Sequence, residues 1–204
     1  MSGSVWGRLS DGAFYHDAIL NGKIVMPRKS VVNTYAEWTA FSATRSGAPV
    51  KSRAVVYPLI RRPDYEFLFV GSAITSEEFS SWHKHSTEDI EKNSELPIGW
   101  AAKLINVYLK TRVYVAREGR VNLYSFIHPP VDNGLWDGIE EYCSVNNQME
   151  ILAKITSVRK IKDIDTYEKY IQIIDGCKQL ASHLKCELLE VEQLWQGTSF
   201  DELG

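Results

Sequence analysis

The sequence predicts a mainly α-helical protein with at most a minor β element. Its strongest signals are apolar residues that recur at helical spacing, and helix-start residues that precede such segments. The chain has 204 residues, 44% hydrophobic and 24% charged, which is typical of a globular protein that buries its own core. We therefore expect a single globular unit over residues 1-204, divided at most into two helical lobes, about 1-95 and 96-204, that share a cleft.

The N-terminal half contains two predicted helices. Residues 1 to 28 hold too many glycines and prolines for a long element. A helix is expected from Ser30 to about Thr44, on the helical spacing of its apolar and aromatic residues: Val31, Tyr35, Trp38, Phe41. The apolar runs between 53 and 70 are interrupted by prolines and are compatible with short strands or with a buried loop and helix. Thr75 followed by Glu78 is a capping box that begins the next helix, which runs towards Asp89.

The most regular predicted helix runs from Pro97 to about Val115. Its expected inward face is apolar and consists of Ala101, Leu104, Ile105, Tyr108 and Leu109. Another side carries the polar residues Lys103, Asn106 and Lys110. Beyond an irregular connection, Asp132 precedes a short helix over 134–143, and two further helices are expected at 166–184 and 188–195.

The charges are unevenly distributed along the chain, although the net charge is only −3. The segment from Trp38 to Pro63 contains no acidic residue and carries the following basic residues: Arg45, Lys51, Arg53, Arg61, Arg62. This segregation predicts either one basic face that binds phosphates or a set of unrelated solvated loops.

The sequence gives no signal for export, membrane insertion or a metal centre. It lacks a signal peptide and a long apolar run, so we expect a cytoplasmic protein that does not enter a membrane. The three cysteines lack the spacing of a zinc site or a disulfide framework, and reduced thiols are expected. His83 and His85 would diverge on a helix, so no metal and no cofactor is predicted.

The segment LPIGWAAKLINVYLK, followed by HPPVDNGLW, resembles the signature region of the helix-hairpin-helix DNA glycosylase superfamily. In that family a glycine-containing turn begins a helix that carries lysine, and a later aspartate precedes another helix. Here the turn is Leu96 to Gly99, and the lysine and aspartate are Lys103 and Asp132. The turn has one clear glycine where the family has two. The interval between the lysine and the aspartate is longer than usual, which resembles the archaeal-type members.

The resemblance implies a helical fold around a cleft and a DNA glycosylase activity. Such an enzyme flips a damaged or modified base out of double-stranded DNA and hydrolyses its N-glycosidic bond, in DNA repair or in defence against phage DNA with modified bases. Asp132 would stabilise the cationic sugar and activate water, and Lys103 would add a lyase step through a Schiff base. The expected DNA contacts are Pro97, Ile98, Gly99, Lys110 and Arg53. The expected base pocket consists of Trp100, His128, Trp136 and Trp82.

Each of these residues also has a purely structural interpretation. Asp132 is a good helix N-cap, Lys103 has the character of an exposed helical lysine, and the tryptophans are typical core residues. Two alternatives to an enzyme follow from this. One is a non-catalytic nucleic-acid-binding helical module, and the other is a helical interaction protein. A monomer is expected in every case.

Overall fold

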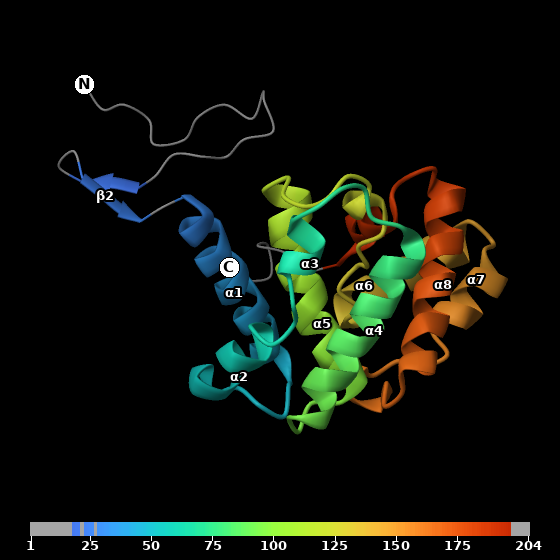
Figure 1. The fold of residues 1–204 in the computed structure, drawn as a ribbon. Coiled ribbons are helices and arrows are strands. Elements are labelled where there is room, and N and C mark those ends of the chain that lie inside the picture. Colours follow the sequence, from blue (N-terminus) through green and yellow to red (C-terminus); the bar gives the residue numbers. More distant parts are fainter. Residues whose placement is uncertain (1–17, 21–22, 27, 197–204) are drawn as a thin grey trace, which may run out of the picture.

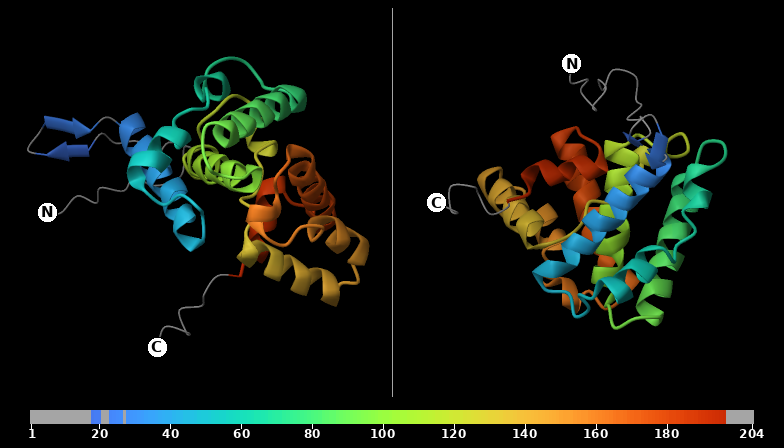
Figure 2. Two further views of the ribbon diagram at one scale, coloured as in Figure 1. Left: turned by 90° about the horizontal axis from the view of Figure 1, so that it is seen from below. Right: turned by 90° about the vertical axis from the view of Figure 1, so that its left-hand side faces the viewer.

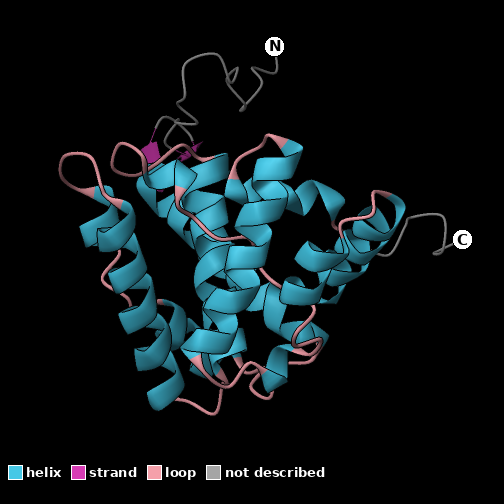
Figure 3. Ribbon diagram, turned by 90° about the vertical axis from the view of Figure 1, so that its right-hand side faces the viewer, coloured by secondary structure: helices cyan, strands magenta, loops and turns pink. Residues whose placement is uncertain are grey.

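The computed structural model describes residues 18–20, 23–26 and 28–196, and this part of the chain is mainly helical, as predicted (Figures 1 and 3). The minor β element is an antiparallel hairpin of β1 (Ala18–Leu20) and β2 (Lys23–Met26), in which Leu20 pairs with Lys23. The hairpin extends away from the helices (Figure 2). The helices therefore build the body of the protein without a supporting sheet.

Helix α1 (Arg28–Ala43) confirms the predicted first helix, and of the four residues at helical spacing only Phe41 is buried. Val31, Tyr35 and Trp38 are exposed, and Tyr35 stacks on Trp38 at 5.8 Å between ring centroids. The buried residues are instead Ala36, Glu37, Ala40 and Phe41. The small alanines allow α1 to lie close to α5, so the aromatic stripe marks the outer side of the helix.

The segment between residues 53 and 70 is helical. A 3-10 turn (Thr44–Ser46) follows α1, and then come α2 (Arg53–Ile60) and the short α3 (Glu66–Phe69). Pro58 lies inside α2 near its C-terminal end. Neither proline therefore marks a strand boundary; Pro58 lies within a helix of two turns, and Pro63 lies in the connection to α3.

Helix α4 (Ser76–Lys92) begins with the predicted capping box. The Thr75 hydroxyl accepts from the Glu78 backbone N–H at 3.2 Å, and Glu78 accepts from the Thr75 N–H at 2.8 Å. These two bonds satisfy backbone donors that the first turn of a helix leaves without partners.

Helix α5 (Ile98–Leu109) is the central helix and packs against α1, α4 and α8 (Figure 1). Every residue of α5 except Val107 is buried, so Lys103 and Asn106 do not form an exposed polar side. The helix continues as a π-helical segment, η3 (Lys110–Val115), which shifts the register of the side chains that follow. The expected single helix from Pro97 to Val115 is therefore two segments with different geometry.

The C-terminal half wraps around the other side of α5. It contains the 3-10 turn η4 (Leu123–Ser125), α6 (Asn133–Val145), α7 (Met149–Ile155), the 3-10 turn η5 (Ile161–Asp163), α8 (Tyr167–Leu184) and the 3-10 helix η6 (Leu188–Leu194). Helices α6 and α8 confirm the predictions, whereas α7 was not predicted and the last element is a 3-10 helix. The buried apolar residues form one cluster from Ala36 in α1 to Val191 in η6.

Neither disulfides nor membrane spans occur in the part of the chain that the structure describes. Cys143 and Cys177 are buried as free thiols and Cys186 is partly buried, in agreement with the expected reduced state. Among the described helices, none combines the length and the apolar character needed to cross a membrane.

Candidate active site

Lys103 and Asp132 form an ion pair at the centre of the molecule. The Lys103 Nζ lies 3.0 Å from Asp132 Oδ2. Lys103 comes from the buried helix α5, and Asp132 is the N-cap of α6, where its extended backbone allows the side chain to turn back over the helix end. The two residues that the resemblance assigns to catalysis are thus in direct contact.

The Asp132 carboxylate caps its helix and also faces solvent. Its Oδ1 accepts from the Leu135 backbone N–H at 3.1 Å and from the Trp195 indole N–H at 2.8 Å. The Asp132 side chain is nevertheless 22% exposed. The N-cap role and an open carboxylate are therefore compatible, because the cap occupies one oxygen and leaves the other to Lys103 and the solvent.

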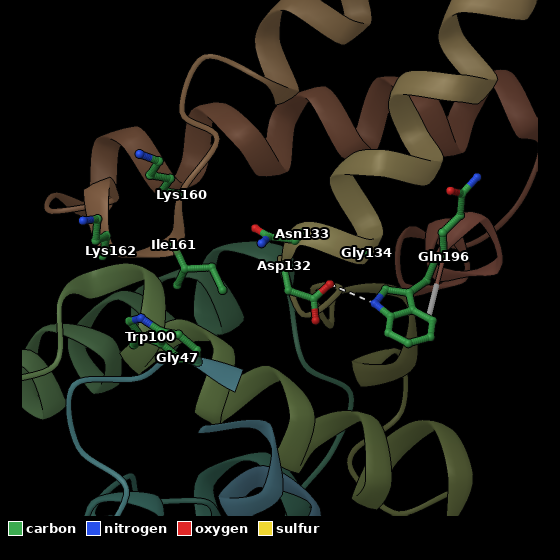
Figure 4. Close-up of a pocket in the computed structure, with 10 residues that line it drawn as sticks. Gly47, Trp100, Asp132, Asn133, Gly134, Lys160, Ile161, Lys162 and Gln196 are labelled. Atoms are coloured by element: carbon green, nitrogen blue, oxygen red, sulfur yellow. Dashed lines mark hydrogen bonds between the residues drawn. The ribbon is translucent and has the colours of Figure 1, made fainter. Parts of the chain in front are cut away.

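A pocket of about 400 Å³ lies at this carboxylate (Figure 4). Its lining comes from the loop after α1, the start of α5, the start of α6, η5 and the end of η6: Gly47, Trp100, Asp132, Asn133, Gly134, Lys160, Ile161, Lys162, Trp195 and Gln196. The close-up shows Asp132 between Trp100 on one side and the bonded indole on the other, with Lys160 and Lys162 on the η5 side. The pocket lining therefore contains two tryptophans, one carboxylate and two lysines.

Lys103 is much more enclosed than its partner. Its side chain is only 5% exposed, and its Nζ lies 5.2 Å from the centroid of the Trp100 ring, in a cation–π contact. An ammonium group so far from water is stabilised by its carboxylate partner and by the ring. This arrangement holds the Nζ atom beside the pocket in a fixed orientation.

A second ion pair flanks the first. The Lys110 Nζ lies 2.8 Å from Glu192 Oε2, and Glu192 belongs to η6. Burial raises the pKa of the Glu192 carboxyl, an effect that Lys110 opposes. Lys110, which sequence reasoning assigned to DNA, is thus held by an acidic partner on the element that also carries Trp195 towards the pocket.

The turn before α5 is covered by another part of the chain. The Gly99 N–H donates to the Ile164 carbonyl at 2.9 Å, and Ile98 is buried. A Cβ atom at Gly99 would lie 2.3 Å from the Ile161 carbonyl oxygen, so only glycine allows η5 to approach this closely. The expected phosphate site at Pro97 to Gly99 is therefore closed by η5, which places its own residues at the surface instead.

Those surface residues are basic. Arg159 pairs with Asp137 and Glu140, whereas Lys160 and Lys162 are exposed and form no ion pair among the described residues. Both lysines line the pocket. Sequence reasoning missed them, although the run VRKIK is a local cluster of positive charge.

Of the four expected base-pocket residues, only Trp100 lines this pocket, and it too belongs to the buried core cluster, with 4% of the residue exposed; the other three lie in the core away from the pocket. The Trp82 indole donates to the Asp64 carbonyl at 2.9 Å, and the Trp136 indole donates to the Ile155 carbonyl at 3.0 Å. His128 is 3% exposed and bonds to the Tyr170 hydroxyl. Each of these rings is buried with its polar atom paired, as is usual for core aromatics.

Arg53 also lies outside the pocket lining. Its guanidinium is 5.7 Å from the centroid of Phe41 and 5.1 Å from that of Tyr57. Arg45 lies over the same Phe41 ring at 5.6 Å. Arg45 and Arg53 therefore lie over the same ring, and of this region of the chain only Gly47 lines the pocket.

His128 belongs to a buried polar cluster made of His83, Asn106, His128, Tyr167 and Tyr170. The Asn106 amide has three partners. Its Nδ2 donates to the Tyr170 hydroxyl at 2.9 Å and to the Pro129 carbonyl at 3.3 Å, and its Oδ1 lies 2.9 Å from His83 Nε2. Burial lowers the pKa of His83 to about 4 and that of His128 well below its ordinary value. Both rings are therefore neutral, and their hydrogen bonds stabilise the packing of the core.

The described residues contain no group of three or more side chains arranged to hold a metal ion. His83 is buried while His85 is exposed, because neighbours two positions apart on a helix point in different directions.

Trp195 is the main residue that sequence reasoning did not assign to the site. It follows η6, and nothing in its local sequence distinguishes it from a core or surface tryptophan. Comparison of the chain with protein family models, with curated proteins and with solved structures finds no match.

Proposed function

We propose that the protein is a DNA glycosylase that flips a damaged or modified base from double-stranded DNA and hydrolyses its N-glycosidic bond. The observation that carries this proposal is the Lys103–Asp132 pair, with 3.0 Å between Nζ and Oδ2; its carboxylate lines an open pocket to which Trp100 also contributes, and the lysine lies directly behind that carboxylate. A buried amine beside a partly exposed carboxylate is the chemistry that such a reaction needs.

Asp132 acts on the sugar. As the bond between base and deoxyribose breaks, positive charge develops on the sugar ring, and a fixed carboxylate stabilises that charge electrostatically. An oxygen of the same carboxylate accepts a proton from the water that attacks the sugar carbon. Because Oδ1 is held by the Leu135 and Trp195 donors, the carboxylate keeps its orientation throughout.

Lys103 supports a second route that cleaves the strand. Its neutral amine forms a bond to the sugar carbon C1′ while the bond to the base breaks, and one of the two protons on the attacking nitrogen passes to the departing base. The last proton on the nitrogen passes to the ring oxygen O4′ as the C1′–O4′ bond breaks, which gives a Schiff base between Lys103 and C1′. Asp132, 3.0 Å away, accepts the proton that the ammonium group must first release.

The pocket has the size and the lining to receive a flipped base. A volume of about 400 Å³ exceeds that of a nucleobase, and Trp100 offers an aromatic wall for stacking. Lys160 and Lys162 on the rim contact the phosphates that flank the flipped nucleotide. They take the place of the turn at Gly99, whose N–H is bonded to Ile164.

The test is excision from duplex oligonucleotides that carry one oxidised, deaminated, alkylated or hypermodified base, followed by cleavage of abasic sites with alkali. The Asp132→Asn variant should be about 10³-fold slower than wild type on any substrate that is cleaved, because the charge that stabilises the transition state is lost. Asp137→Asn is the matched control, since Asp137 is an exposed carboxylate on the same helix. Full activity in Asp132→Asn would contradict the proposal.

Borohydride trapping tests the lyase route separately. A covalent protein–DNA adduct should form with wild type and with Lys154→Ala, an exposed lysine on α7, and should be absent with Lys103→Ala. Salt-sensitive DNA binding without any abasic product, on every substrate, would instead support the non-catalytic binding module.

A further inference from the structure

We infer that Trp195 positions the Asp132 carboxylate and forms the second aromatic wall of the base pocket. This inference rests on the proposed glycosylase function, and it adds a residue that neither the sequence pattern nor the resemblance assigns. Its indole N–H donates to Asp132 Oδ1 at 2.8 Å, although the two residues are far apart in the chain. The residue lines the pocket and is 48% exposed.

Two glycines of α6 make this contact possible. A Cβ atom at Gly134 would lie 2.5 Å from the Trp195 indole nitrogen, and one at Gly138 would lie 1.6 Å from the Leu194 carbonyl oxygen. The Gln196 N–H in turn donates to the Gly134 carbonyl at 2.9 Å. The end of η6 therefore lies directly against the backbone of α6, on a face without side chains.

Glycine inside a helix costs about 1 kcal/mol relative to alanine, and α6 contains two, one turn apart. Both glycines lie where the segment from Leu194 to Gln196 contacts the backbone of α6, and a side chain at either position would collide with that segment. The approach brings one indole N–H to one carboxylate oxygen. The glycine pair NGLWDG is therefore the sequence signal that accompanies the positioning of Trp195.

The hydrogen bond fixes which carboxylate oxygen faces the reaction. Oδ1 is held by Trp195 on one side and by the Leu135 N–H on the other. Oδ2 lies beside Lys103 and the pocket. Without the indole donor, the carboxylate retains only its cap bond and its ion pair, so Oδ1 is held by one donor in place of two.

The indole is also partly exposed. Its N–H is bonded to Asp132, while the residue lines the pocket and is 48% exposed. An exposed indole is suited to stack on a base. Trp195 and Trp100 both line the pocket together with Asp132.

The first arm of the test examines the contact and does not require activity. In a ¹⁵N-labelled protein, the indole N–H signals of the tryptophans are recorded for wild type and for Asp132→Asn, with Trp195→Phe identifying the Trp195 signal. We expect Asp132→Asn to move the Trp195 signal more than the signal of any other tryptophan. An unmoved Trp195 signal would overturn the inference.

The second arm separates positioning from binding by comparing single-turnover excision with the Kd for DNA that carries the substrate base. Trp195→Phe keeps a ring but loses the donor, so excision should slow by about tenfold at an unchanged Kd. Trp195→Ala also loses the wall and should weaken binding by about tenfold. Trp38→Phe, an exposed tryptophan on α1, is the matched control.

A double substitution adds a check on mechanism. Because Trp195 acts through the carboxylate, Trp195→Phe should slow excision no further in an Asp132→Asn background. Wild-type rates in Trp195→Phe, or an additional loss in the double variant, would overturn the positioning role. If wild type forms no abasic product, the proposed function fails as a whole, whereas an active wild type with an active Trp195→Phe variant defeats this inference alone.

Discussion

Two polar groups on neighbouring turns of α5 behave in opposite ways. Asn106 lies at the centre of the buried polar cluster, where its amide bonds to His83, Tyr170 and Pro129 and is 1% exposed. Lys103, one turn earlier, is equally buried but bonds to a carboxylate that opens to a pocket. The first cluster is buried except at its edge, where Tyr167 lines a surface pocket, whereas the second opens to solvent at the Asp132 carboxylate itself.

Asn106 and Lys103 differ in the groups that they bond to and not in the helix that carries them. The closed cluster uses neutral groups that hydrogen-bond to one another, so it carries no charge for chemistry. The open pair keeps a full negative charge at the pocket, supported by three donors. A helix face can therefore carry a structural and a reactive polar residue within one turn.

The largest effect on stability should come from breaking the closed cluster. In Asn106→Leu, His83 and Tyr170 lose buried partners, and the free energy of unfolding should fall by about 3 kcal/mol. Urea denaturation followed by circular dichroism measures this loss. A change below about 1 kcal/mol would show that water enters the cluster and that it is not closed.

Acid should weaken the same cluster in a defined pH range. Because burial holds the His83 pKa at about 4 in the folded protein, below its ordinary value of 6.5, the unfolded chain binds protons first as the pH falls. The stability contribution is complete above pH 6.5 and is lost between pH 6.5 and about 4, by up to about 1.4 kcal/mol per pH unit for each such histidine. His128, with its pKa lowered by burial and by His83, adds in the same direction.

Denaturation midpoints measured from pH 7 to pH 4 check this prediction. His85→Gln, at an exposed position on the same helix, should leave the slope unchanged, whereas His83→Gln should reduce it. An equal slope in wild type and His83→Gln would contradict a neutral, buried His83.

Breaking the open pair should cost less. In Lys103→Met the Asp132 carboxylate keeps the Leu135 and Trp195 donors and its access to solvent, so we expect a loss of about 1 kcal/mol in the free energy of unfolding. Borohydride trapping should disappear in the same variant. A loss as large as that of Asn106→Leu would mean that the pair is a structural element like the closed cluster.

The smallest effect is expected at the rim. Lys160→Gln and Lys162→Gln should each weaken DNA binding about threefold, and each should reduce the slope of log Kd against log salt by about 1, as for the loss of one phosphate contact. Fluorescence anisotropy at several salt concentrations measures both quantities. Unchanged slopes would place the DNA elsewhere on the protein.

The sequence alone predicted the helical fold class, several helix boundaries and the local role of Asp132 as an N-cap. These follow from signals within a few residues of each other, such as the capping box at Thr75 and Glu78. The spacing in α1 predicted a helix but not its buried face, because periodicity locates a stripe without saying whether it meets the core. In α1 the stripe of Tyr35 and Trp38 faces outward.

The pocket could not be predicted in the same way. Its walls come from η5 and from the end of η6, and both approach through glycines whose partners are remote in sequence, Gly99 with Ile161 and Gly138 with Leu194. The sequence around a tryptophan does not indicate whether its ring will line a pocket or pack in the core. Trp82 and Trp136 therefore lie in the core, and Trp195 at the pocket was missed.

The close approach at Gly99 makes the shape of the pocket sensitive to a single methyl group. The segment that carries Lys160 and Lys162 contacts α5 at the one position where a hydrogen atom replaces a side chain. A Gly99→Ala exchange would lift that segment and move both lysines together, while the Lys103–Asp132 pair stays anchored in the core. Under the proposed glycosylase function, variation at this position is expected to alter which DNA binds before it alters how the bond is broken.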